Sequence, residues 1–117
     1  MLDSIARQLV AKAIREILQF DVPCVGVFDE VILVQRTDLS PADEVLILLH
    51  FGGEQGFNRT ALGKYVQAAA PRVTEALASL SSPQIRRIVK LANGNYRLTD
   101  LGSKYIRENL SEKLLLQ

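Results

Sequence analysis

Two consecutive segments decide the fold: Pro71–Ser82, with the sequence PRVTEALASLSS, and Gln84–Thr99, with the sequence QIRRIVKLANGNYRLT. Apolar residues of the first segment recur at the spacing of one helix face: Val73, Ala76, Leu77 and Leu80. Pro71 suits the first helical position because its missing N–H would have no partner there. The pattern therefore predicts a helix over Pro71–Ser82 with one buried face.

The second segment has the features of a β-hairpin. Strand-like runs at Ile85–Leu91 and Tyr96–Thr99 flank the dipeptide Asn93-Gly94. A type I′ turn needs positive φ at both central residues, and Asn-Gly is a common solution. Because side chains alternate along a strand, we expect Arg86 and Arg87 to point to opposite faces of the hairpin.

Together these segments resemble the winged helix-turn-helix superfamily of DNA-binding proteins, and in particular MarR-like bacterial regulators. Leu62–Val66 is similar to the first helix of the motif, Ala68–Ala70 to its turn, and Pro71–Ser82 to its second helix. The hairpin corresponds to the wing, and Tyr96–Gly102 is similar to the exit from the wing, tyrosine-x-leucine-threonine followed after two residues by glycine. The resemblance implies a transcriptional regulator that binds duplex DNA.

Charge is segregated along the chain, although the formal net charge is only +1. Between Asn58 and Arg97, seven basic residues stand against the single acid Glu75, a net charge of +6. Between Asp21 and Phe57, one arginine stands against seven acids, a net charge of −6. Positive charge on the elements that would face DNA favours a polyanionic partner.

The helix over Pro71–Ser82 is expected to enter the major groove. Arg72 is the expected guanine contact, and Thr74 and Ser79 are expected to contact bases or phosphates. The other cations are expected to contact phosphates: Arg59, Lys64, Arg86, Arg87, Lys90 and Arg97. Asn93 at the hairpin tip is expected mainly to form the turn. A contact with the minor groove is its second expected role.

Helix signals bracket residues 40–53. They are an N-cap, a proline at the first position, two acids in the first turn and a terminal glycine pair: Ser40, Pro41, Asp43, Glu44 and Gly52-Gly53. Residues 45–49 are all apolar, so this helix is expected at the buried centre of the domain. The acids that precede the helix, with Glu54 after it, are expected to form a solvated face.

The remaining strands and helices are predicted from shorter patterns. Val31–Val34 favours a buried strand, although a helix segment fits so short a run as well. Gly56-Phe57 is expected to form a strand that pairs with the hairpin, and Asn58 or Thr60 to cap the helix after it.

The two ends of the chain are predicted to be helical and to form the surface of a homodimer. An amphipathic helix is expected over about Asp3–Phe20, with a stripe wide enough for a partner subunit or for the protein's own core. Thr99 is expected to cap a C-terminal helix, and Gly102 predicts that its first turn lies close to another backbone. Leu101, Tyr105, Leu110 and Leu114 are expected to form an apolar stripe along that helix.

The predicted fold is α+β and mostly α, a winged helix-turn-helix with an extra N-terminal helix and a C-terminal helix. A chain of 117 residues suits one domain. Its expected parts are residues 1–38 as N-terminal helix and extension, 39–102 as winged-helix core and 103–117 as C-terminal helix.

Cys24 and His50 are the only residues of their types, which argues against a disulfide, a metal site and nucleophilic catalysis. We expect neither an enzyme nor a bound cofactor. Charged residues interrupt the N-terminal apolar stretch, so it does not match a signal peptide or a membrane span. A cytoplasmic protein without a membrane partner is expected.

A second hypothesis is that the winged helix is a protein-interaction module within a larger assembly. The exposed face of the helix over Pro71–Ser82 carries few basic groups and includes Glu75, and the segment Asp21–Phe57 is acidic. Both features favour this alternative. The two hypotheses differ in salt dependence, because DNA binding weakens steeply with ionic strength and an apolar interface does not.

Overall fold

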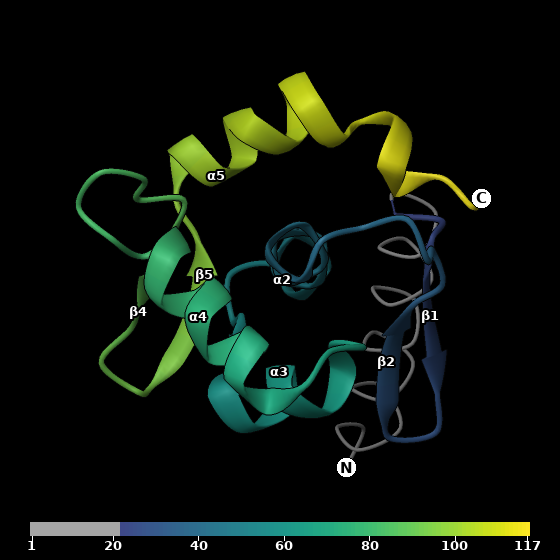
Figure 1. The fold of residues 1–117 in the computed structure, drawn as a ribbon, viewed down its shortest axis with the longest axis horizontal. Helices are drawn as coiled ribbons and strands as arrows, with labels where there is room; N and C mark the ends of the chain where they lie inside the picture. The colour runs from purple at the N-terminus through teal and green to yellow at the C-terminus, as the bar shows by residue number, and fades with distance from the viewer. Residues whose placement is uncertain (1–21) are drawn as a thin grey trace, which may run out of the picture.

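Helix α2, Pro41–Gly52, runs through the centre of the structure, a computed structural model that describes residues 22–117 (Figure 1). Ser40 caps it by accepting a hydrogen bond from the Asp43 N–H at 3.2 Å, and Gly53 ends it with a φ of 62°. Residues 45–49 are completely buried. The predicted bounds and central position of this helix are confirmed.

Two small antiparallel sheets accompany the helices. Strands β1, Val25–Phe28, and β2, Val31–Val34, form a hairpin in which Val25 pairs with Val34 and Phe28 with Val31. The turn between them uses Asp29 at a φ of 55°, a conformation that aspartate tolerates better than most residues. The predicted strand at Val31–Val34 is therefore confirmed, but only Val34 of it is buried, so the expected burial of the whole strand is wrong. Its partner strand β1 was not anticipated.

The second sheet has the order β3-β5-β4, with strands β3, Phe57–Asn58, β5, Asn95–Leu98, and β4, Ile88–Lys90. The expected pairing of the strand near Phe57 with the hairpin is confirmed. Gly94 has a positive φ of 90°, but Asn93 does not, so the expected type I′ turn at Asn93-Gly94 is wrong. The Leu91 carbonyl instead accepts the Gly94 N–H at 2.9 Å, which makes Ala92 and Asn93 the central residues of the turn.

The hairpin is shorter than predicted, because β4 begins at Ile88 rather than Ile85. Residues 81–87 form a loop in which Arg86 has a φ of 49°. The expectation that Arg86 and Arg87 alternate across a strand is therefore wrong. The Arg86 carbonyl accepts a hydrogen bond from Thr99 Oγ1 at 2.5 Å, and this contact holds the loop against the start of the last helix.

Helices α3, Arg59–Tyr65, and α4, Ala70–Leu80, lie between strands β3 and β4 in the sequence. Asn58 is the N-cap of α3, and its side chain accepts the Ala61 N–H at 2.8 Å. The predicted inner face of α4 is confirmed: Val73, Ala76, Leu77 and Leu80 are buried. The helix ends two residues earlier than predicted, and the hydroxyls of Ser81 and Ser82 bind the last carbonyls of α4.

The C-terminal segment is not one regular α-helix. Helix α5, Asp100–Tyr105, continues as a π-helical stretch, Ile106–Leu110, and then as a 3-10 turn, Glu112–Leu114. Thr99 caps α5 as expected. A Cβ added to Gly102 would overlap the Arg87 carbonyl oxygen, so the predicted close approach of two backbones is confirmed. Of the predicted apolar stripe, Leu110 is buried and Tyr105 is half-buried, whereas Leu101 is 53% exposed.

The end of the chain attaches to the segment that follows β2. The Cys24 N–H donates to the Leu114 carbonyl at 2.8 Å, and Arg36 Nη1 donates to the Leu115 carbonyl at 2.9 Å. Asp38 accepts from both Arg36 and Lys113. These contacts hold the C-terminal segment beside the hairpin β1–β2, as Figure 1 shows.

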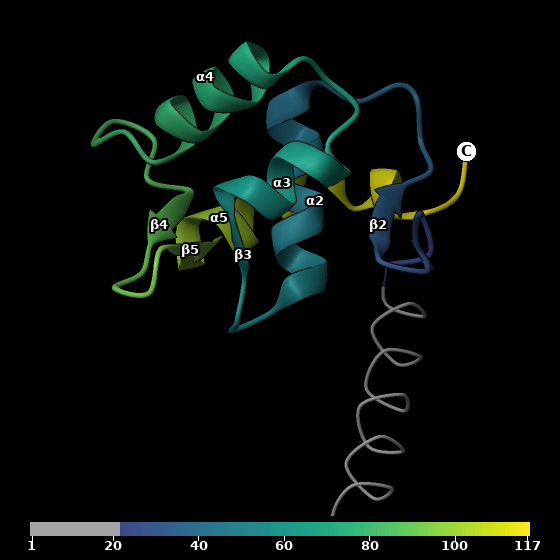
Figure 2. The same cartoon turned by 90° about the horizontal axis from the view of Figure 1, so that it is seen from below.

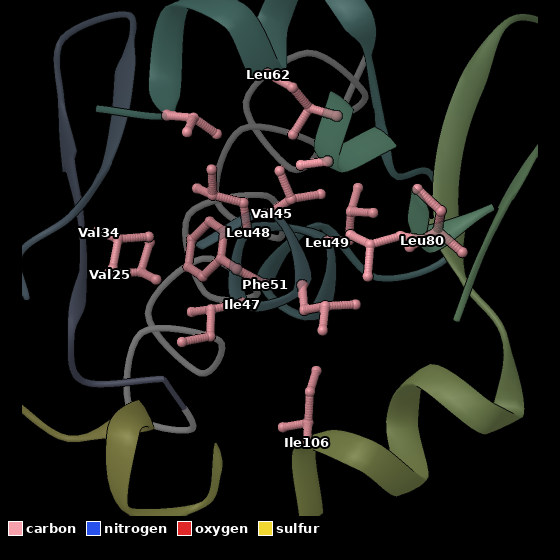
Figure 3. Packing of buried hydrophobic residues seen from close by; sticks show 14 of the residues in the cluster. Val25, Val34, Val45, Ile47, Leu48, Leu49, Phe51, Leu62, Leu80 and Ile106 are labelled. Atoms are coloured by element: carbon pink, nitrogen blue, oxygen red, sulfur yellow. The ribbon is translucent and has the colours of Figure 1, made fainter. Parts of the chain in front are cut away.

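One hydrophobic core joins the described elements (Figure 3). Side chains from α2 meet Val34 of the hairpin β1–β2, Leu62 of α3, Leu80 of α4 and Ile106 of the C-terminal segment. The N-terminal helix expected over Asp3–Phe20 lies outside the described residues.

Candidate nucleic-acid interface

Helix α4 presents an open face on the outside of the described molecule. In Figure 2, α4 lies along the upper edge of the molecule, above α3 and the hairpin β4–β5, and the C-terminus lies at the right. Residues of α4 away from its buried face are exposed: Pro71, Arg72, Glu75, Ala78 and Ser79. No part of residues 22–117 covers this face.

Arg59 links three elements at one side of α4. Its Nη2 donates to Thr74 Oγ1 at 2.6 Å, and Thr74 Oγ1 in turn donates to the Ala70 carbonyl at 3.1 Å. Two shallow pockets of about 210 Å³ each are lined by both Arg59 and Thr74. One extends toward Ala78 and Tyr96, so it lies between α4 and β5. The other extends over α3.

The hairpin β4–β5 directs one of its cations toward this surface and another away from it. Lys90 pairs with Tyr96 across the strands, and directly opposite residues share a face. Lys90 Nζ lies 6.0 Å from the centre of the Tyr96 ring. Arg97 follows Tyr96 in β5 and so points to the other face, where it lines a pocket of about 180 Å³ with Glu54 and Asp100.

Arg86 and Arg87 differ in their surroundings. The Arg86 side chain is exposed. The Arg87 guanidinium carbon lies 3.7 Å above the centre of the Tyr105 ring, in a cation–π stack at the junction with α5. The Arg87 side chain therefore packs on Tyr105, whereas the Arg86 side chain is exposed to solvent.

The other predicted contact residues are spread over the open surface. Lys64 of α3 is exposed, as are Arg72 and Ser79 of α4. Arg72 precedes Thr74 by two residues, about 200° around the helix, so it lies on the opposite flank from Arg59. Asn93 is exposed, and its Oδ1 accepts the Asn95 N–H at 2.9 Å, which is the expected turn contact.

The cations between Asn58 and Arg97 have no acidic partner within the described residues. The three ion pairs there are Arg36–Asp38, Lys113–Asp38 and Lys104–Glu108. All of them lie outside the segment with the net charge of +6. The positive charge of this segment is therefore available to an external anion.

Glu44 is a structural residue whose burial the sequence analysis did not predict. It lies in the first turn of α2 as expected, but it is only 6% exposed. Glu44 Oε2 accepts the Gln67 N–H at 2.7 Å and so fixes the turn between α3 and α4. Burial raises the pKa of its carboxyl, against the opposing effect of that hydrogen bond. The all-apolar run of residues 45–49 was the available signal, because a helix buried all round leaves no solvated side.

The chain has no match among protein-family models, and no curated protein or solved structure matches it significantly. Residues 22–117 contain no group of three or more His, Cys, Asp or Glu side chains that could hold a metal ion. No helix of this part of the chain is long and apolar enough to cross a membrane.

Proposed function

We propose that residues 41–105 form a winged helix-turn-helix and that the protein binds duplex DNA, as a transcriptional regulator, through α4 and the wing β4–β5. The order helix, strand, two helices, hairpin, helix supports this fold, as does the sheet order β3-β5-β4. The observation that carries the function is the set of cations beside the open face of α4 that have no acidic partner among residues 22–117.

Phosphate contacts supply most of the affinity in this proposal. Arg59 at the start of α3 lines the pocket between α4 and β5, and Lys90 on the wing lies 6.0 Å from the ring of Tyr96, which lines the same pocket. Neutralising phosphates releases counterions from the duplex, so affinity falls steeply as salt rises. Base contacts come from the exposed face of α4, where Arg72 suits guanine and Glu75 suits the cytosine amino group.

The test is fluorescence anisotropy with a labelled duplex of mixed sequence at two salt concentrations. We expect binding at low salt, with an affinity that falls on a double-logarithmic plot against salt. Arg59→Ala and Lys90→Ala should each weaken binding and reduce the steepness of that plot by about 1. Lys104→Ala is the matched control, because Lys104 is an exposed cation of α5 that pairs with Glu108.

Two results contradict the proposal. One is the absence of duplex binding at low salt. The other is an equal effect of Lys104→Ala and the two test variants, because the named surface would then have no special part in binding.

A protein-interaction module is the second candidate, and one observation favours it. Phe28 and Val31 are cross-strand partners at the tip of the hairpin β1–β2 and are 52% and 40% exposed. Exposed apolar pairs of this kind suit a protein partner. If this is the main interface, Phe28→Ser should abolish capture of that partner, and raising the salt concentration should leave capture intact.

A homodimer through the chain ends remains a proposal. Leu115 and Leu116 are 54% and 58% exposed and offer apolar surface for it. Sedimentation velocity that finds only a monomer at micromolar concentration would contradict the dimer without affecting the DNA proposal.

A further inference from the structure

Thr74 occupies a position between a cation and the backbone of its own helix. Its Oγ1 accepts a hydrogen bond from Arg59 Nη2 at 2.6 Å and donates to the Ala70 carbonyl at 3.1 Å. A hydroxyl has one hydrogen. Because that hydrogen is used within α4, Thr74 has none left to donate to a phosphate or to a base acceptor.

The same geometry orients Arg59. A guanidinium has five N–H donors in a planar fork, and Thr74 engages one of them. The fork lies beside both shallow pockets, and none of their lining residues within the described part of the chain is acidic. Its remaining donors are suited to bidentate binding of a phosphate. An arginine that is held in place before binding loses less side-chain freedom when the anion arrives.

We propose that Thr74 is a positioning residue for Arg59, which binds a backbone phosphodiester of duplex DNA, and that Thr74 does not read bases. This inference rests on the proposed DNA-binding function. In this proposal Thr74 contributes to the overall affinity for DNA by orienting Arg59. Arg72, on the opposite flank of α4, is the residue that contacts bases and so contributes to sequence specificity. A positioning residue of this kind affects every DNA sequence equally, because phosphates carry no sequence information.

The test uses two substitutions at one position. Thr74→Val keeps the branched shape and removes the hydroxyl, whereas Thr74→Ser keeps the hydroxyl. Dissociation constants are measured by anisotropy for a set of duplexes that differ at single base pairs, with thermal unfolding as a check that each variant folds. We expect Thr74→Val to weaken binding about three- to tenfold, by the same factor for every duplex. Thr74→Ser should bind within about twofold of the unmodified protein.

A double-mutant cycle with Arg59→Ala isolates the contact. If Thr74 acts through Arg59, Thr74→Val should have no further effect on binding once Arg59 is absent. Ser79→Ala is the matched control, because Ser79 is an exposed hydroxyl residue on the other flank of α4. Its effect should be the same with and without Arg59.

Several outcomes separate the possibilities. A change in base preference at one position in Thr74→Val would make Thr74 a base reader and overturn the inference. An undiminished effect of Thr74→Val in the Arg59→Ala background would also overturn it. Either result leaves the DNA-binding function standing. The absence of duplex binding by the unmodified protein would instead overturn the function and the inference with it.

Discussion

Glu44 shows how one buried carboxylate sets the geometry of the α3–α4 turn. Its hydrogen bond to the Gln67 N–H holds the chain at the point where it turns toward α4. Glu44→Ala removes the acceptor, and we expect it to lower the free energy of unfolding by about 1–2 kcal/mol. Urea denaturation followed by circular dichroism measures this loss.

Glu44→Gln tests the ionisation of the same group. Because the pKa of Glu44 is raised in the folded state, the ionised carboxyl opposes folding. The cost is absent below the unfolded pKa and grows as pH rises through the folded pKa. Glutamine keeps an acceptor and cannot ionise, so its stability relative to the unmodified protein should increase from pH 4 upward and then level off. Asp43→Asn, at the neighbouring carboxylate, is the control. A difference that does not change with pH would contradict this assignment.

At the scale of the elements, the sequence predicted the helix bounds and buried faces that depend on residues close together in the chain. The bounds of α2 followed from Ser40 and Gly53, and the buried face of α4 followed from its apolar spacing. Residues 85–87 were predicted as strand but belong to a loop, because the loop's conformation depends on Thr99, which is distant in sequence.

For the candidate site, the sequence predicted the basic segment but not the contacts that its cations make within the fold. Charge segregation indicated the basic segment, but pattern alone does not show which cations a fold uses for its own contacts. The stack of Arg87 on Tyr105 and the bond between Arg59 and Thr74 each join residues fifteen or more positions apart. No periodicity within a single helix or strand reports such contacts.

The junction of α4, the hairpin β4–β5 and α5 depends on Arg87. Its N–H donates to the Leu80 carbonyl at 2.9 Å, its carbonyl accepts the Thr99 N–H at 3.0 Å, and its side chain covers Tyr105. We expect Arg87→Ala to lower the free energy of unfolding by about 1 kcal/mol, from the lost stack and packing. Arg86→Ala, at an exposed neighbour, should change it by less than about 0.5 kcal/mol. Equal effects in urea denaturation would show that the stack does not stabilise the junction.

At the scale of the whole molecule, the C-terminal segment closes the structure by attaching to the segment after β2. Asp38 is the centre of this attachment: Arg36 donates to both of its oxygens, and Lys113 Nζ lies 2.6 Å from Oδ2. The hydrogen bonds from Arg36 and Lys113 lower the pKa of the Asp38 carboxyl well below its ordinary range. The stabilisation is therefore present above the unfolded pKa and is lost only as pH falls through the folded pKa.

Asp38→Asn should release the C-terminal segment at neutral pH while the central core around α2 stays folded. The Cys24 amide reports the release, because its N–H donates to the Leu114 carbonyl at 2.8 Å. We expect its hydrogen-exchange protection factor to fall several-fold in Asp38→Asn, whereas amides in the middle of α2 keep theirs, since local opening there requires the core to unfold. Lys104→Gln breaks an ion pair elsewhere in the C-terminal segment and should leave the Cys24 amide protected. High salt should weaken the attachment in the unmodified protein as well, because these charges are partly exposed. If Cys24 kept its full protection in Asp38→Asn, the attachment would depend on the backbone contacts and not on the charges.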